Sequence, residues 1–265
     1  MSSRSSMAER IPVLMYHRVG AARNAWEARY CVSPERFEHQ MNALHGRGMQ
    51  ACSTDELVAW LLDGRPLADG SFVLTFDDGF MGVYEHALPA LSALAWRATV
   101  FLVSGLIGKR DHWTAQANPA GVSYPLLGKR EIAEMAKHGF SFQSHTRSHP
   151  DLRSLSALEL AEELGGARCD LEDLLGGPVR YLAYPFGWHD QRVVDAAQAS
   201  GYSAAFCTQP GFNRRSIDRY RIRRLEVYGT DSPAALLRKV ALGTNDGSLW
   251  HSVRYYGARV AARLR

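Results

Sequence analysis

The chain has 265 residues, of which 46% are hydrophobic and 22% are charged. This length and composition are typical of a globular protein with a substantial core, and they exclude a short binding peptide, widespread disorder and a collagen-like repeat. The formal net charge is +4, and the stretch 242–265 contributes +3 of it, from four arginines against one aspartate. The rest of the chain is nearly neutral, which argues against nucleic-acid binding.

Targeting signals are absent from the sequence pattern. Arg97 interrupts the best apolar stretch, between Ala87 and Gly108, so no segment reaches the length of a membrane span. The apolar run 11–16 is too short for a signal peptide, so we expect a cytoplasmic protein. The four cysteines are widely spaced, which predicts free thiols.

The absence of a linker predicts one domain over 11–241, between a disordered segment 1–10 and a basic C-terminal tail 242–265. In the tail, apolar residues recur at near-helical spacing with arginines between them, as at Tyr256 and Val260. Two interpretations stay open: a helix on an anionic membrane surface, which would make the protein membrane-peripheral, and a solvated helix packed on the domain.

Short β-rich segments alternate with helical stretches along the chain, which is typical of βα units in a parallel sheet or barrel. The predicted strands are Pro12–Tyr16, Phe72–Phe76, Thr99–Val103, Ser141–Ser144, Tyr181–Tyr184, Ser203–Thr208 and Arg221–Val227. Seven strands is a number that suits a barrel.

Helix starts between these strands carry N-cap signals. They are Ser33 before Pro34, Ser156 with Glu159, and Ser232 before Pro233. The stretch Ser104–Gly128 has little periodicity and is longer than ordinary loops, which predicts either a functional or a loosely ordered segment.

Polar residues follow four of the predicted strands directly. They are His17, the pair Asp77 and Asp78, His145, and the turn 185–187. The carboxyl ends of parallel strands meet at one end of a barrel or one edge of a sheet, where binding sites are built. We therefore expect these residues to lie in one site.

Asp77 and Asp78 are adjacent carboxylates at a strand end, followed by Gly79, which permits a sharp turn. Adjacent side chains on an extended chain point in different directions. One carboxylate can then bind a cation while the other faces substrate or water, as metal-assisted hydrolysis requires. The alternative is an Asx turn that caps the next helix.

His145 and His149 lie four residues apart, just before Pro150. One turn of helix-like backbone would aim both imidazoles at one ion, whereas the alternative is two surface histidines without a role. With Asp78 the pair gives three ligands and leaves a coordination position open for water, as catalytic zinc sites do. For His17, three roles stay open: a further ligand, a general acid and a core histidine.

Two segments together resemble the first two motifs of the polysaccharide deacetylases, the NodB-homology or carbohydrate esterase family 4 domain. They are Thr75-Phe76-Asp77-Asp78-Gly79 and the nine residues 144–152, SHTRSHPDL. The segments 131–139, EIAEMAKHG, and 183–187, AYPFG, follow the family's order, and the resemblance covers residues 11–241. It implies an α/β fold, a distorted (β/α)7-type barrel in a single domain.

The resemblance also implies metal-dependent removal of N-acetyl groups from an amino sugar, oligosaccharide or glycan precursor, usually with zinc. Asp77 corresponds to the general base. Asp78, His145 and His149 correspond to the metal ligands, and the backbone N–H of Phe186 to a donor for the oxyanion. The expected partner is therefore a carbohydrate.

Two positions depart from the family pattern. The third motif usually begins with an arginine that orients the base, and Ala183 stands there. Arg221, Arg223 and Arg224, on a late strand, are the candidates to replace it.

The late Leu-x-His motif that supplies the general acid is also missing. In the branch of the poly-N-acetylglucosamine deacetylases, in which the motif order is circularly permuted, a Tyr-His near the N-terminus serves as the acid. Tyr16-His17 resembles that pair. Two other functions stay open: an O-acetyl esterase or other amidase with the same site, and a catalytically silent carbohydrate-binding protein.

Overall fold

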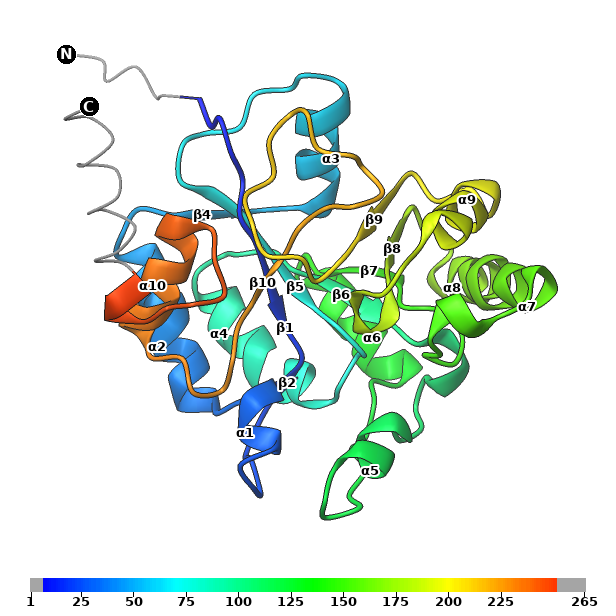
Figure 1. Ribbon diagram of the computed structural model, residues 1–265. Coiled ribbons are helices and arrows are strands. Elements are labelled where there is room, and N and C mark those ends of the chain that lie inside the picture. The colour runs from blue at the N-terminus through cyan, green and yellow to red at the C-terminus, as the bar shows by residue number, and fades with distance from the viewer. Residues whose placement is uncertain (1–6, 252–265) are drawn as a thin grey trace.

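The computed structural model describes residues 7–251. Its centre is a curled sheet in which every strand pair is parallel, in the order β10-β1-β5-β6-β7-β8-β9 (Figure 1). These strands are β1 (Val13–Tyr16), β5 (Ser71–Phe76), β6 (Thr99–Leu102), β7 (Ser141–Ser144), β8 (Tyr181–Ala183), β9 (Ala204–Phe206) and β10 (Leu225–Glu226). All seven predicted strands are thus present, and the curled sheet, which forms a half-barrel, is consistent with the predicted distorted barrel.

Three short strands were not predicted. β4 (Gln50–Cys52) pairs with the first half of β5, and β2 (Arg18–Val19) pairs with β3 (Cys31–Val32) in a separate two-stranded sheet. They have two or three residues each, which is too short for a recognisable alternation of apolar and polar side chains.

The strands form because their side chains are buried on both faces, as in other parallel sheets. Along β1, Val13 faces the inside of the curl, where it packs with Phe101, Phe206 and the buried Trp60. Its neighbour Leu14 belongs to the other cluster, between the sheet and the surrounding helices. The two sides of the sheet therefore hold two separate cores.

Helices surround the sheet, with α2, α4 and α10 on one side in Figure 1 and α7, α8 and α9 on the other. Their bounds are α2 (Pro34–His45), α3 (Thr54–Leu62), α4 (Leu88–Ala93), α6 (Lys129–Lys137), α7 (Ala157–Ala161), α8 (Ala167–Leu175), α9 (Gln191–Ala199) and α10 (Pro233–Leu242). Two short helices, α1 (Glu27–Tyr30) and α5 (Trp113–Ala117), lie at the end of the sheet opposite α3.

Shorter helical turns connect these elements. The π turns are Val83–Ala87 and Glu162–Gly166, and the 3-10 turns are Ser104–Leu106, Leu152–Ser154 and Pro185–Gly187. The stretch predicted as a functional or loosely ordered loop thus contains one of these turns and α5.

The three predicted helix starts are confirmed. Ser33, Ser156 and Ser232 each accept a hydrogen bond from the backbone N–H three residues later. Ser156 forms a full capping box with Glu159, and a second such box, Ser53 with Glu56, begins α3. The Ser-x-x-Glu spacing was the signal for this fourth start.

The ends of the chain bear on the predicted domain boundaries only in part. Ala8 is buried, and its N–H donates to the Leu67 carbonyl at 2.9 Å. Residues 1–6 and 252–265, with most of the basic tail, lie outside the described residues, so the boundaries stay predictions. Within residues 7–251, no helix has the length and apolar character needed to cross a bilayer. All four cysteines are free thiols.

We expect Ser156→Ala to lower the free energy of unfolding by about 1 kcal/mol, because the first turn of α7 loses its N-cap acceptor. Ser156→Asp is the control, since aspartate caps a helix equally well. Urea unfolding measures both variants. Equal losses in the two variants would show that the cap contributes nothing.

Candidate active site

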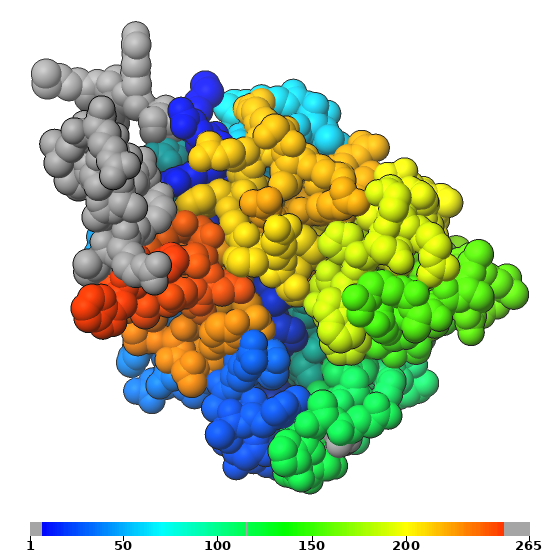
Figure 2. All heavy atoms as spheres, viewed as in Figure 1, coloured from blue at the N-terminus to red at the C-terminus, as the bar shows by residue number. Residues whose placement is uncertain are grey.

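A pocket of about 780 Å³ opens at the carboxyl ends of the strands. In Figure 2 the surface is hollowed between the blue segment around α1 and the green segment around α5. The pocket is lined by His17, Asp77, Asp78, His145, His149 and Phe186. The structure therefore brings together the residues that the sequence placed at four strand ends.

Asp77 is paired with a buried arginine. Arg224 donates from one terminal nitrogen to Asp77 Oδ1 at 2.6 Å and from the other to Oδ2 at 2.8 Å, and its Nε donates to the Cys207 carbonyl at 3.1 Å. Burial would raise the pKa of Asp77, but the Arg224 guanidinium and His145 outweigh burial and hold that pKa below its usual range. The carboxylate is therefore kept ionised, and the Asx-turn alternative does not describe it.

The other two arginines point elsewhere. Arg221 pairs with Asp218 at 3.4 Å and donates to Gln191 at 2.9 Å. Arg223 has its Nε buried without a hydrogen-bond partner, and its backbone N–H donates to Asn213. Of the three candidates, the structure thus places Arg224 alone on Asp77.

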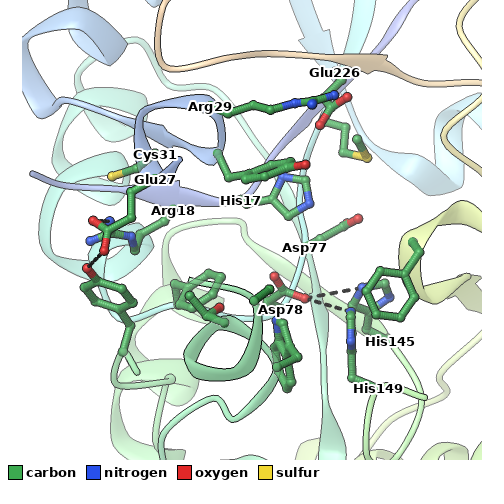
Figure 3. A pocket seen from close by; sticks show the side chains of 18 of the residues that line it. His17, Arg18, Glu27, Arg29, Cys31, Asp77, Asp78, His145, His149 and Glu226 are labelled. Carbon is green, nitrogen blue, oxygen red and sulfur yellow. Dashed lines mark hydrogen bonds and ion pairs between the residues drawn. The ribbon is translucent and has the colours of Figure 1, made fainter. Parts of the chain in front are cut away.

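Asp78 is turned toward the two histidines, as Figure 3 shows. Its Oδ1 lies 3.4 Å from His145 Nε2 and 3.3 Å from His149 Nε2, and all three side chains are at least 93% buried. The three ligand atoms lie within 4.8 Å of one another. This is the arrangement that the sequence predicted for a metal site.

The hydrogen bonds of this cluster leave lone pairs available to bind a cation. His145 Nδ1 lies 2.7 Å from the Ala183 carbonyl, which can only accept, so Nδ1 is the donor and Nε2 presents a lone pair to Asp78 in the neutral ring. Asp78 Oδ1 is buried and has no hydrogen-bond partner. Two imidazole nitrogens and one carboxylate oxygen are a donor set that suits zinc and related divalent ions. The residues fit such an ion.

The titration of the cluster follows from the same contacts. Burial would raise the pKa of Asp78, but the two histidines lower it to about 2. Burial lowers the pKa of His149 to about 3, whereas Asp77 and Asp78 raise that of His145 in spite of burial. The site thus holds an ionised Asp78 that no described lysine or arginine pairs with.

The backbone around the site is unusual. Five described non-glycine residues have a positive φ, and four of them are Asp78, Thr146, His149 and Phe186. Such conformations are costly and concentrate at functional sites. They also correct one expectation, because the segment from His145 to His149 is a loop with two left-handed residues and not a helix-like turn.

His17 and Phe186 border the cluster. His17 lies outside the ligand group, with Nδ1 buried and unpartnered and its ring edge-on to Tyr30 at 5.7 Å. Phe186 has φ 58°, and its ring lies edge-on to His149 at 4.7 Å. The Trp113 ring stacks on the His149 ring, with 4.2 Å between the ring centres. The catalytic roles predicted for His17 and for the Phe186 N–H stay predictions.

One feature of the pocket was missed in the sequence. Glu27 is 2% exposed and accepts hydrogen bonds from Arg18 at 2.8 Å, from Asn118 at 2.6 Å and from Tyr124 at 2.5 Å. It thereby joins the segment of α1 to the segment of α5 across one wall. No local pattern indicates this, because Glu27 and Asn118 lie 91 residues apart.

The sequence matches the model of one protein family and is similar to proteins that are named as deacetylases. The model of the polysaccharide deacetylase family matches residues 64–205. YxkH of Bacillus subtilis is 27% identical over 218 residues, which are 82% of this chain and 71% of that protein. The poly-beta-1,6-N-acetyl-D-glucosamine N-deacetylase of Staphylococcus epidermidis is 24% identical over 210 residues, which are 75% of this chain and 68% of that enzyme.

Solved structures share the fold. The Streptococcus pyogenes deacetylase PplD, in complex with acetate, matches with a TM-score of 0.75 and 25% identity, over 87% of this chain and 98% of that chain. IcaB from Ammonifex degensii matches with a TM-score of 0.74 and 24% identity, over 89% and 97%. The predicted fold class, a distorted (β/α)7-type barrel in one domain, is confirmed.

We expect Arg224→Met to lower the free energy of unfolding by about 3–5 kcal/mol, because Asp77 would keep a buried charge without its partner. The measurement is urea unfolding at neutral pH. Arg221→Met, which breaks an exposed pair with Asp218, is the matched control and should cost less than about 1 kcal/mol. Similar losses in both variants would contradict the importance of the buried pair.

Metal content tests the site formed by Asp78, His145 and His149. We expect about one divalent ion per chain after equilibration with Zn²⁺ and dialysis, and its loss in His145→Ala, because two neutral or anionic ligands hold such an ion weakly. Elemental mass spectrometry measures the stoichiometry. His138→Ala, at an exposed histidine beside Glu134, is the control and should keep the ion. A protein without metal would contradict the site.

Proposed function

The chain belongs to the polysaccharide deacetylase family, and from this we propose that it is a metal-dependent hydrolase that removes N-acetyl groups from an acetylated amino sugar or its oligosaccharide. The observation that carries the proposal is the cluster of Asp78, His145 and His149 beside the ionised Asp77, in a pocket that also contains His17. Relatives named as poly-beta-1,6-N-acetyl-D-glucosamine N-deacetylases make an N-acetylglucosamine oligomer the first substrate to test.

Asp78, His145 and His149 would hold the divalent ion, and zinc fits the donor set. When bound, the ion supplies Lewis acidity, which polarises the acetyl carbonyl and lowers the pKa of water. The Ala183 carbonyl fixes the orientation of the His145 ring through its Nδ1–H. The last residue of β8 thus orients one of the three ligands, His145.

Asp77 would act as the general base. Its carboxylate is ionised and held at both oxygens by Arg224, so it can accept a proton from the water that attacks the acetyl carbon. The bidentate pair also fixes the direction of the carboxylate. Arg224 thereby has the effect expected of the arginine that is missing at position 183.

His17 would act as the general acid. The amine is a poor leaving group unless it gains a proton as the C–N bond breaks, and His17 lies in the same pocket as Asp77. The backbone N–H of Phe186 would donate to the oxygen that gains negative charge. Hydrolysis then releases acetate and the free amino sugar, with the water proton on Asp77 and the His17 proton on the amine.

We expect the protein to release acetate from N-acetylglucosamine oligomers, and His17→Ala to reduce turnover by about 100- to 10,000-fold because the leaving amine loses its proton donor. Acetate release measures turnover, and elemental analysis should show unchanged metal content. His138→Ala is again the control. An unchanged rate in His17→Ala would remove this residue from the mechanism.

The same assay tests the alternative functions. Faster release from O-acetylated than from N-acetylated sugars would indicate an esterase. Binding of the sugar without any acetate release, in the metal-loaded protein, would indicate the catalytically silent protein. Either result would overturn the proposed N-deacetylase activity.

A further inference from the structure

The loop between the two histidines has a backbone that is not stable by itself. Thr146 has φ 67° and His149 has φ 64°, and side chains with a Cβ adopt this region only where the surroundings fix it. Within the loop, Thr146 Oγ1 accepts a hydrogen bond from the His149 N–H at 3.0 Å. The conformation of residues 147 and 148, between these two strained positions, depends on contacts from outside.

Glu163 makes these contacts with both oxygens of its carboxylate. Oε2 accepts from the backbone N–H groups of Arg147 and Ser148, each at 2.9 Å, and Oε1 accepts from the Ser148 hydroxyl at 2.6 Å. Hydrogen bonds to an ionised carboxylate are stronger than those between neutral groups. One side chain thus binds two successive residues of the loop that carries His149.

Glu163 lies in an irregular turn of the helical segment that faces the loop. Residues Glu162–Gly166 form a π turn between α7 and α8, a feature that is frequent at functional sites. Leu164 from this turn is buried in the core, while Glu163 reaches the loop. About two turns further on, Asp170 accepts two hydrogen bonds from the Arg147 guanidinium, at 2.9 Å each. Helix and loop are therefore joined through backbone and side chain.

The carbonyl groups of the loop are bound by the 3-10 turn after β6. The N–H of Ser104 donates to the Thr146 carbonyl at 3.1 Å, and the N–H of Gly105 donates to the Arg147 carbonyl at 2.9 Å. A Cβ on Gly105 would lie 2.6 Å from that carbonyl oxygen, so this close approach requires glycine. The 3-10 turn thus binds two carbonyl groups of the loop, and Glu163 accepts from the N–H groups of Arg147 and Ser148.

We propose that Glu163 is a positioning residue that sets the place of His149 and thereby the metal affinity of the site. The inference rests on the proposed function, because it assumes that Asp78, His145 and His149 bind a divalent ion. Without Glu163, water can replace the acceptor for the exposed N–H groups of Arg147 and Ser148, so the domain stays folded while the loop gains freedom. Residues that orient metal ligands typically change affinity by about 10- to 100-fold.

The test is the Zn²⁺ affinity of the full chain, measured by competition with a chelating dye. We expect Glu163→Ala to weaken Zn²⁺ binding by about 10- to 100-fold. Glu163→Gln should weaken it less, because its amide oxygen keeps one acceptor for the loop. The matched control is Glu162→Ala, at the exposed neighbouring carboxylate, which should bind Zn²⁺ as the unaltered protein does.

Two further measurements separate positioning from a general loss of structure. The melting temperature of the metal-free protein should be nearly the same with and without Glu163→Ala. The visible absorption of the Co²⁺-loaded protein, which reports ligand geometry, should change in Glu163→Ala and stay the same in Glu162→Ala. If Glu163→Ala does not fold, Glu163→Gln takes its place in both comparisons.

Equal Zn²⁺ affinity in the unaltered protein and the Glu163 variant would overturn the inference, and so would equal losses in the Glu162 and Glu163 variants. An unaltered protein that binds no Zn²⁺ would instead contradict the proposed function, and the inference with it. Because these measurements need no substrate, they distinguish the two failures.

Discussion

The active site depends on how two adjacent buried carboxylates are balanced by positive charge. Asp77 and Asp78 both follow β5, where burial favours their neutral forms. Arg224 balances Asp77 through a bidentate pair in the interior of the fold. Asp78 meets two imidazoles, which carry no fixed charge and present nitrogen lone pairs when neutral. One strand end therefore presents an ionised carboxylate and, beside it, the three donor atoms proposed to bind a divalent ion.

Much of the fold could be predicted from the sequence because its strands are buried on both faces. Apolar runs such as Val13–Tyr16 and Phe72–Leu74 are typical of strands that are buried on both faces of a parallel sheet. Helix starts at Ser33 and Ser156 were equally readable, since an N-cap acts within three residues. The same logic located the site, because the carboxyl ends of parallel strands must meet.

What the sequence did not predict depends on contacts between distant residues. The sequence could not distinguish between Arg221, Arg223 and Arg224. Only the fold shows that Arg224, directly before β10, reaches Asp77. Glu27 joins two segments that are 91 residues apart, and Glu163 holds a loop that lies 15 or 16 residues before it. The helix-like turn predicted for residues 145–149 was wrong as well, because the spacing of two histidines does not reveal left-handed backbone at Thr146.

The exchange of arginine positions has a physical explanation in the barrel interior. Ala183 belongs to the inner cluster together with Phe101 and Phe206, and its side chain is small. Arg224 occupies the same interior, with its guanidinium carbon 5.6 Å from the centre of the Phe101 ring. A guanidinium could pair with the Asp77 carboxylate from the end of β8 or from the residue before β10. The pairing therefore fixes the position of the positive charge beside Asp77, and not the strand that carries the arginine. The missing arginine at position 183 is therefore weak evidence for a catalytically silent protein, because Arg224 supplies a guanidinium to Asp77 from another position.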